Sequence, residues 1–403
     1  MAISTSETHA GTPAEKTNNT AHWSGVFAMS LCVFTLIASE FMPVSLLTPI
    51  ASDLHITEGM AGQGIAISGA FAVLTSLLLP MLIGSMDRKK LMLILTVLMG
   101  VSGSIVALAP NYPVYMLGRA LIGVVIGGFW SMSAAMAIRL VPPNKVPKAL
   151  AIFNGGNALA TVIAAPLGSY LGSIIGWRGA FLAIIPVALI TLIWQWIALP
   201  SMKGKASASG SGPSTILKAL KNRAVAYGMA GCGAFFMGQF ALFTYLRPFL
   251  ETVTQTTVST LSLLLLTIGF SGFIGTLIIS SILKRTLYGL LIGIPVFMAA
   301  IAVMLISAGN YVAPVALLLA LWGLVATAAP VAWWTWLAKA MPDNAEAGGG
   351  LMVAVIQLSI ALGSTIGGIL FDADGYQSTF IASAAVLFIS AFLSLQAYRM
   401  QTK

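Results

Sequence analysis

Glu40 is the acidic side chain that falls within an apolar stretch long enough to cross a membrane. A charged group at the bilayer centre costs about 2.5 kcal/mol or more, so an ionisable residue there is a functional hypothesis by default. Arg119 is the basic residue placed within another such stretch. At 1.5 Å per residue, Glu40 lies about 15 Å inside Ile50 and Arg119 about 9 Å beyond Pro113, so the two could meet. Because a nearby cation favours the ionised carboxylate and burial favours the neutral acid, the pair could bind and release a proton.

Both residues also have a purely structural interpretation. Glu40 could be a buried carboxyl group that its neighbours satisfy and that never exchanges its proton. Arg119 could extend along its helix and place its guanidinium at the membrane surface. The proton-coupling hypothesis predicts instead that the two residues lie together inside the protein.

The composition indicates an integral membrane protein. Of the 403 residues, 58% are hydrophobic and 8% are charged, and the mean hydropathy is +0.95, whereas about a quarter of the residues of a soluble domain are charged. The apolar runs reach the roughly 20 residues that a helix needs to cross the hydrocarbon, and they lack the alternation of barrel strands. We therefore predict an all-α membrane protein. Twelve spans are expected, at approximately 24–50, 60–84, 91–109, 113–138, 149–175, 180–199, 224–250, 259–283, 287–308, 313–338, 348–371 and 378–397.

The basic residues set the predicted orientation. With both termini in the cytoplasm, all but three of the 20 Lys and Arg residues lie on the cytoplasmic side; Arg178 and Arg247 lie outside and Arg119 lies within a span. This bias follows the positive-inside rule. The net charge of +9 therefore reflects topology and gives no reason to expect nucleic-acid binding. Cys32 and Cys232 both lie in apolar spans, so the sequence suggests neither a disulfide framework nor a metal site.

The two halves of the chain match each other at an offset of 199 or 200 residues, with Glu40–Pro49 over Gln239–Pro248 and Gly176 over Gly375. Each half holds an even number of spans, so both insert in the same orientation. The prediction is two six-helix parallel repeats, as in six-plus-six transporters that rock around a central site. The expected organisation is a disordered cytoplasmic tail (1–22), an N-terminal six-helix bundle (23–199), a flexible cytoplasmic linker (200–222) and a C-terminal six-helix bundle (223–403).

Three segments carry transporter-like motifs: Gly84-Ser-Met-Asp-Arg-Lys-Lys90, Leu117-Gly-Arg-Ala-Leu-Ile-Gly-Val-Val-Ile-Gly-Gly128, and Gly155–Gly168. They resemble motifs of the major facilitator superfamily, and within it the twelve-span proton-coupled efflux branch, and the resemblance covers essentially the whole chain. It implies a gating role for Asp87 and Arg88 in the loop, and it places Arg119 as the intramembrane arginine. It also implies that Pro166 and Gly168 belong to an antiporter motif, in which small residues allow close helix approach.

Further similarity lies in Glu40–Pro49, Gly127–Pro143, Phe243–Pro248, Trp334–Trp336 and Val353–Leu358. These stretches resemble purine-nucleoside efflux pumps, with sugar-efflux transporters next. The resemblance implies a secondary transporter of a bacterial-type inner membrane that exports a small, polar, largely uncharged solute in exchange for protons. It implies no cofactor, because a proton gradient supplies the energy. The expected partners are the solute and membrane lipid, and the expected state is a monomer.

A nucleoside site needs aromatic faces for stacking and amide or hydroxyl groups for the base edges and the ribose. The candidates are Phe41, Trp130, Asn154, Asn157, Gln239, Tyr245, Trp333, Trp336 and Gln357. Aromatic residues in spans often face lipid or pack between helices. An amide that faces lipid leaves its polar groups unpaired, so the amides are the stronger candidates. Arg247, beside Pro248, is either an interfacial anchor or a gate.

Other functions are weighed against this one. Enzyme chemistry finds no support, because His9, His22 and His55 fall in the tail or an outer loop and no nucleophile or nucleotide-binding motif occurs. A sugar or multidrug efflux antiporter and a facilitator or uptake symporter stay open as transport alternatives. A transport-inactive membrane sensor is a further alternative, for which we would expect a soluble signalling domain or a long tail.

Overall fold

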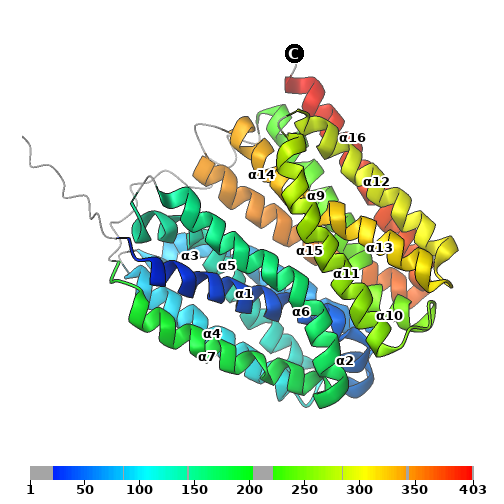
Figure 1. The fold of residues 1–403 in the computed structure, drawn as a ribbon, viewed down its shortest axis with the longest axis horizontal. Coiled ribbons are helices and arrows are strands. Elements are labelled where there is room, and N and C mark those ends of the chain that lie inside the picture. The colour runs from blue at the N-terminus through cyan, green and yellow to red at the C-terminus, as the bar shows by residue number, and fades with distance from the viewer. Residues whose placement is uncertain are drawn as a thin grey trace, which may run out of the picture.

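The computed structural model describes residues 21–84, 86–142, 145–202, 221–283, 285–341 and 345–401, and all regular secondary structure in these ranges is helical. The predicted tail (1–22) and linker (200–222) lie almost entirely outside the described residues. The helices, labelled as in Figure 1, are α1 Trp23–Ser45, α2 Leu47–Leu54, α3 Glu58–Ile83, α4 Arg88–Ala107, α5 Tyr112–Leu140, α6 Val146–Leu182, α7 Ile184–Ala198, α9 Arg223–Phe243, α10 Leu246–Thr252, α11 Val258–Leu283, α12 Leu287–Ala308, α13 Val312–Ala326, α14 Ala329–Ala340, α15 Ala345–Asp374 and α16 Tyr376–Gln401.

Polar caps and glycines set many of the helix boundaries. Thr57, Asp87 and Asn111 are the N-caps of α3, α4 and α5, and each side-chain oxygen accepts a backbone N–H group from the first turn. Gly176 and Gly375 adopt φ values of 73° and 79°, in the left-handed region that glycine enters at little cost. These two glycines lie where the chain passes from one predicted span to the next.

Three of the predicted spans are each broken into two helices. Span 24–50 comprises α1 and α2, which meet at Leu46, three residues after Pro43. Span 224–250 comprises α9 and α10, and span 313–338 comprises α13 and α14. Pro248 and Pro330 lie in the first turns of α10 and α14, where the missing N–H group needs no helical partner.

Eleven segments of the described chain are long and apolar enough to cross a membrane, one fewer than predicted. The difference lies in Lys148–Ala198, a stretch of 51 residues that is counted once. At 1.5 Å per residue it extends over about 75 Å, more than twice the thickness of the hydrocarbon core. Gly176 interrupts it with non-helical backbone, and the predicted spans 149–175 and 180–199 fall on either side. The segment is therefore long enough for both predicted crossings.

The molecule has two chemically different ends. One end of the molecule holds the first residues of α1 and the last residues of α16. There, Lys148 Nζ lies 5.3 Å from the Trp23 ring centroid, and the Tyr288 hydroxyl donates to Gln401 Oε1 at 2.7 Å. We call this the basic end, after Arg88, Lys145, Arg223 and Lys339. The opposite end includes α2 and α10 (Figure 1), and we call it the acidic end, after Asp53, Glu58, Glu251 and Asp372.

The first half of the chain (α1–α7) and the second half (α9–α16) lie side by side (Figure 1). They meet mainly along two helix pairs, α3 with α15 and α6 with α11. Glycine allows both approaches: a Cβ at Gly69 would lie 2.7 Å from the carbonyl oxygen of Gln357, and a Cβ at Gly269 would lie 2.6 Å from Cα of Val162. This close packing of small residues is the usual way in which helices associate in lipid.

Polar contacts join the two halves at the acidic end. Asp372 of α15 accepts hydrogen bonds from Thr57 Oγ1 at 2.6 Å and from the Gly59 backbone N–H at 2.9 Å. Deeper along the same pair of helices, Thr365 Oγ1 donates to Gln63 Oε1 at 3.0 Å. Asp372 thus lies at the N-terminus of α3, where the helix dipole favours a negative charge. Hydrogen bonds between α3 and α15 thus join the two halves at the acidic end.

Candidate functional site

Arg119 lies on α5 in the interior of the first half and is 1% exposed. Its guanidinium donates to the carbonyl oxygens of Gly64 (3.0 Å), Ser39 (2.9 Å) and Glu40 (3.1 Å) and to Ser68 Oγ (3.2 Å). Its planar guanidinium therefore hydrogen-bonds α5 to both α1 and α3. Arg119 does not reach the surface, so the snorkelling interpretation is wrong.

Pro43 explains why α1 needs this arginine. Proline has no backbone N–H group, so the carbonyl oxygen of Ser39, four residues earlier, lacks its helical donor. Nη1 of Arg119 supplies that donor at 2.9 Å. The buried guanidinium of Arg119 thus supplies the hydrogen bond that the Ser39 carbonyl lacks because of Pro43.

Glu40 lies at the junction between the two halves and is 4% exposed. Its Oε1 accepts a hydrogen bond from Nε2 of Gln357, on α15 of the second half, at 3.4 Å. Arg119 contacts the backbone carbonyl of Glu40, while the carboxylate is directed at Gln357. The two residues do lie together as expected, but Arg119 holds the backbone of Glu40 and forms no direct ion pair with its carboxylate.

An aromatic pair crosses the junction next to Glu40 in the chain. Phe41 of α1 stacks on Phe240 of α9, with ring centroids 5.6 Å apart and planes inclined by 25°. The neighbouring Gln239 is half-buried, and its Oε1 has no hydrogen-bond partner; the same is true of Oε1 of the buried Gln357. Buried acceptors are nearly always paired in proteins. These two amide oxygens could therefore accept hydrogen bonds from a bound molecule.

Asn154 and Asn157 lie on the side of α6 opposite Leu159. Leu159 is 53% exposed. At about 100° per residue, Asn154 lies about 140° and Asn157 about 160° from Leu159 around the helix axis. Asn154 is exposed and Asn157 is half-buried. Neither amide points to the same side of α6 as Leu159.

The other aromatic candidates are more deeply packed. Tyr245, Trp333 and Trp336 are each at most 1% exposed. Nε1 of Trp336 donates to the Tyr288 hydroxyl at 3.0 Å, and the Tyr245 hydroxyl donates to the carbonyl of Ser364 at 2.7 Å. Packing accounts for these side chains without a ligand. Trp333 and Trp336 pack within the second half, whereas Tyr245 packs across the junction, where its hydroxyl oxygen lies too close to Gly62 of α3 to leave room for a Cβ.

Trp130 differs from these residues because it keeps an accessible surface. It is half-buried and packs edge-to-face on the buried Phe129, with ring centroids 5.7 Å apart. In another adjacent aromatic pair, Trp333 and Trp334, Trp334 is 42% exposed and Trp333 is 1% exposed. Of the three candidate tryptophans, Trp130 is the one that a solute could reach.

A family comparison agrees with this arrangement of helices and buried charges. The family model described as Major Facilitator Superfamily matches residues 29–363. The chain belongs to the major facilitator superfamily. It is therefore a membrane transporter by family, and not an enzyme, and transporters of this superfamily generally need no bound cofactor.

Two relatives within the superfamily cover nearly the whole chain. Transcription regulatory protein OpdE of Pseudomonas aeruginosa is 63% identical over 385 residues, which are 95% of this chain and 96% of the relative. Purine ribonucleoside efflux pump NepI of Salmonella typhimurium is 40% identical over 372 residues, 92% of this chain and 93% of the relative. The chain is thus similar to proteins whose names indicate two different roles.

Solved structures of superfamily members share the fold. A D-xylose-proton symporter has a TM-score of 0.75 at 15% identity and covers 93% of this chain and 97% of its own. An inward-facing bacterial homologue of the human lysosomal transporter Spinster has a TM-score of 0.70 at 16% identity, with coverages of 96% and 98%. At this identity the likeness concerns the fold alone.

The superfamily loop motif forms a clasp within the first half. Asp87 accepts hydrogen bonds from the backbone N–H groups of Lys89 (2.8 Å) and Met202 (2.9 Å) and from the Ser201 hydroxyl. The Arg88 backbone N–H in turn donates to the Met202 carbonyl at 3.0 Å. Asp87, the N-cap of α4, thus holds Ser201 and Met202, which follow α7, against the start of α4. Partial burial raises the pKa of Asp87, but these hydrogen bonds and the nearby Lys90 outweigh it and leave the pKa below its ordinary value.

Replacing Asp87 by Ala should lower the free energy of unfolding by about 1 kcal/mol, because the cap and the clasp are both lost. Since the folded pKa is depressed, the charge-dependent stabilisation is complete above the ordinary pKa of an aspartate and is lost as the pH falls through the folded value. The control Asp87→Asn keeps a capping oxygen without the charge. Thermal unfolding in detergent should therefore show wild type approaching Asp87→Asn at acidic pH, and parallel curves at all pH values would contradict this.

The antiporter-like motif brings α6 against α1. A Cβ at Gly168 would lie 2.6 Å from Ser45 Oγ and 3.1 Å from Met42 Cγ. Pro166 is half-buried inside α6. The motif therefore packs against the part of α1 that follows Glu40.

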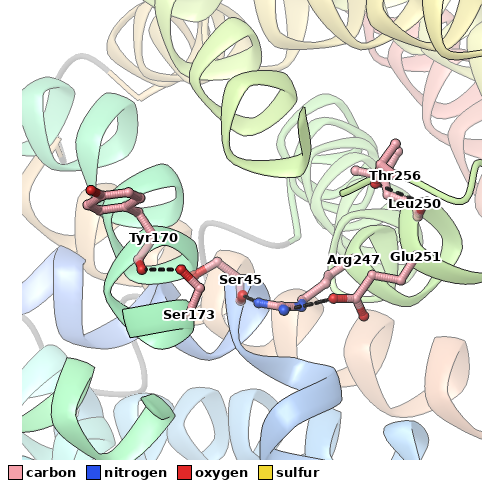
Figure 2. A network of polar contacts seen from close by, with 7 residues as sticks. All are labelled: Ser45, Tyr170, Ser173, Arg247, Leu250, Glu251 and Thr256. Atoms are coloured by element: carbon pink, nitrogen blue, oxygen red, sulfur yellow. Dashed lines mark hydrogen bonds and ion pairs between the residues drawn. The ribbon is translucent and has the colours of Figure 1, made fainter. Parts of the chain in front are cut away.

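Arg247 links the second half to the end of α1. Figure 2 shows its guanidinium between the carbonyl of Ser45 and the carboxylate of Glu251. Nε of Arg247 is 2.8 Å and Nη2 is 2.7 Å from Glu251 Oε1. Because the contact crosses the junction and Arg247 is buried, the gate interpretation fits the geometry better than an anchor at the membrane surface.

The sequence interpretation missed two participants in the junction. Phe240 could have been found, because it follows Gln239 at the same offset at which Phe41 follows Glu40. Asp372 gave no local signal, since an acid at the end of a span is ordinary. Its contact with α3 depends on which helices meet across the junction.

Proposed function

We propose that this superfamily member is a proton-coupled antiporter that exports a small polar solute, with a purine nucleoside as the first candidate, by rocker-switch alternating access. One observation carries the proposal: the intramembrane carboxylate of Glu40 meets Gln357 of the opposite half at their junction. If the halves rock about this junction, gain or loss of a proton at Glu40 acts directly on the contact between them. The 40% identity to a purine ribonucleoside efflux pump supports the choice of solute.

The proposed architecture is two six-helix parallel repeats, residues 23–199 and 223–403, with 1–22 as a tail and 200–222 as a linker. Two structural features that recur at an offset of 199 residues support it. The breaks after α1 and α9 fall at Leu46 and Tyr245, and the glycines with positive φ are Gly176 and Gly375. By the positive-inside rule the basic end faces the cytoplasm of a bacterial-type inner membrane. We propose that the protein acts there as a monomer.

The proposed solute site lies between the halves, beside Glu40. Phe41 and Phe240 offer aromatic faces for a base, and Trp130 offers a third nearer the basic end. The unpaired oxygens of Gln239 and Gln357 can accept from an exocyclic amine or a ribose hydroxyl, and the amides of Asn154 and Asn157 can both donate and accept. Tyr245, Trp333 and Trp336 are left out, because packing already accounts for them.

The test is transport into inverted membrane vesicles with an imposed pH gradient, acid inside, using inosine, guanosine, a sugar and a cationic dye. The proposal predicts uptake of the two nucleosides that collapses when the gradient is dissipated. Uptake of the dye alone would make the chain a multidrug exporter. Uptake that ignores the gradient would make it a facilitator.

Phe240→Ala should weaken nucleoside binding by about fivefold, because a stacked aromatic contact contributes about 1 kcal/mol. The matched control is Phe270→Ala, which removes an aromatic ring that is 60% exposed on α11. Titration of the purified protein with inosine measures both dissociation constants. Equal affinities of Phe240→Ala and Phe270→Ala for inosine would show that the Phe41–Phe240 pair does not contact the solute.

A second candidate is a regulatory role, which the 63% identity to a protein named as a transcription regulator favours. The two candidates differ in what a transport-inactive variant should do in cells. If Glu40→Gln restores transcript levels in a deletion strain as fully as wild type does, regulation does not require transport. If it fails to restore them, any regulatory effect follows from the movement of solute.

A further inference from the structure

Gln357 lies where α3 of the first half and α15 of the second half approach closely. It is 5% exposed, and its backbone carbonyl lies against Gly69 of α3, where a Cβ would be 2.7 Å away. From this position Nε2 donates to Glu40 Oε1 at 3.4 Å, while Oε1 of Gln357 has no partner. The amide therefore contacts the carboxyl group with only one of its two ends.

The hydrogen-bonding capacity of the two groups depends on the proton. An ionised carboxylate only accepts, so it can pair with the N–H group of Gln357 but must leave the amide oxygen unpaired. A protonated Glu40 can donate its O–H to that oxygen and still accept from Nε2, which forms a two-bond ring between acid and amide. A proton on Glu40 thus completes the contact between α1 and α15.

No other side chain of the described residues donates to this carboxyl group. The charged or titratable groups on the elements packed against α1 include Arg119 and Tyr115 of α5, Arg247 and Glu251 of α10, Asp53 of α2 and Lys148 of α6. The elements α3, α4 and α7 present the uncharged Ser68, Thr96 and Thr191. Arg119 is occupied by backbone carbonyls and Ser68, Arg247 by Ser45 and Glu251, and Asp53 by Arg178. Gln357 is thus the side chain through which the second half responds to the proton.

We propose that Gln357 is a positioning residue that transmits the protonation of Glu40 to the closure of the acidic end. Proton binding stabilises the arrangement in which the two halves are joined there, and proton loss weakens it. This direction suits an exporter: a proton taken from outside closes the outer side, and its release inside frees the solute-loaded carrier to open outward. The inference rests on the proposed proton coupling at Glu40.

Spin labels at Pro110→Cys and Asn310→Cys, exposed positions at the acidic end of each half, would measure closure by their separation, with Cys32 and Cys232 replaced by Ala. In otherwise unchanged protein, we expect the closed fraction to rise at least about threefold from mildly alkaline to mildly acidic pH. Gln357→Leu, of similar size but without polar atoms, should lose this response. Gln357→Asn, which keeps the amide on a shorter side chain, should restore part of it.

Glu40→Gln should be closed at both pH values, because an amide pair also satisfies both ends of Gln357. Adding Gln357→Leu to Glu40→Gln should reopen the acidic end without restoring a pH response. A full pH response in Gln357→Leu would overturn the role of Gln357 and leave the proposed function intact. A full response in Glu40→Gln would overturn both.

Discussion

Glu40→Gln should abolish the accumulation of nucleoside driven by a pH gradient in inverted vesicles. Glutamine keeps the shape of the side chain but cannot gain or lose a proton at neutral pH, so solute movement is no longer exchanged against protons. Exchange of labelled for unlabelled solute needs no net proton movement, so it should persist in Glu40→Gln. It should be slower than in wild type, because this variant favours the closed acidic end and exchange requires that end to open. The measurement is uptake of labelled inosine with and without the gradient.

The matched control is Asp53→Asn, which also removes one carboxylate. Asp53 pairs with Arg178 at the acidic end, and both side chains are more than one-third exposed. An exposed ion pair contributes about 1 kcal/mol or less, so this variant should transport like wild type. Loss of gradient-driven uptake in both variants would show that the effect is not specific to Glu40.

Arg119→Leu should lower the free energy of unfolding by at least about 3 kcal/mol, the largest stability effect that we expect from one substitution in this chain. The leucine leaves the buried carbonyl of Ser39 without a donor, which costs about 1–3 kcal/mol, and it also removes the charged hydrogen bonds to Gly64 and Ser68. The Ser39 carbonyl contributes most to this loss, because Pro43 has no backbone N–H group that could donate to it in place of Arg119. Unfolding in detergent, followed by tryptophan fluorescence, measures the change.

Two further variants separate charge from geometry. Arg119→Lys keeps the charge but cannot spread donors over three carbonyls, so it should recover less than half of the loss. Arg178→Leu removes an arginine whose side chain is 36% exposed, and it should cost about 1 kcal/mol or less. If Arg119→Leu were as stable as Arg178→Leu, the bracing role of Arg119 would be wrong.

Much of the fold could be predicted from the sequence, because hydropathy and charge bias act along the chain. The spans and the clustering of basic residues at span ends follow from local composition. The family follows from the resemblance of motifs such as Leu117–Gly128. The broken helices were harder to predict. A run such as 24–50 is apolar throughout, and Pro43 within it does not by itself specify that one helix ends and another begins at Leu46.

The candidate site could be predicted only in part. Depth along the helices correctly brought Glu40 and Arg119 together, but it could not show that Arg119 binds the backbone beside Pro43. The contact of Glu40 with Gln357 depends on how α3 and α15 cross, which no spacing in the chain specifies. Residue type favours Trp333 and Trp336 as solute contacts; both are 1% exposed and packed in the structure, and their role stays a prediction.

The central claim is that proton and solute compete through Glu40, and proton release on solute binding tests it most directly. Purified protein in weakly buffered detergent would be mixed with inosine while a pH-sensitive dye reports free protons. We predict that wild type releases protons in proportion to bound inosine, and that Glu40→Gln binds inosine without releasing any. Inosine binding to wild type with no change in free protons, or equal release from Glu40→Gln, would contradict the account.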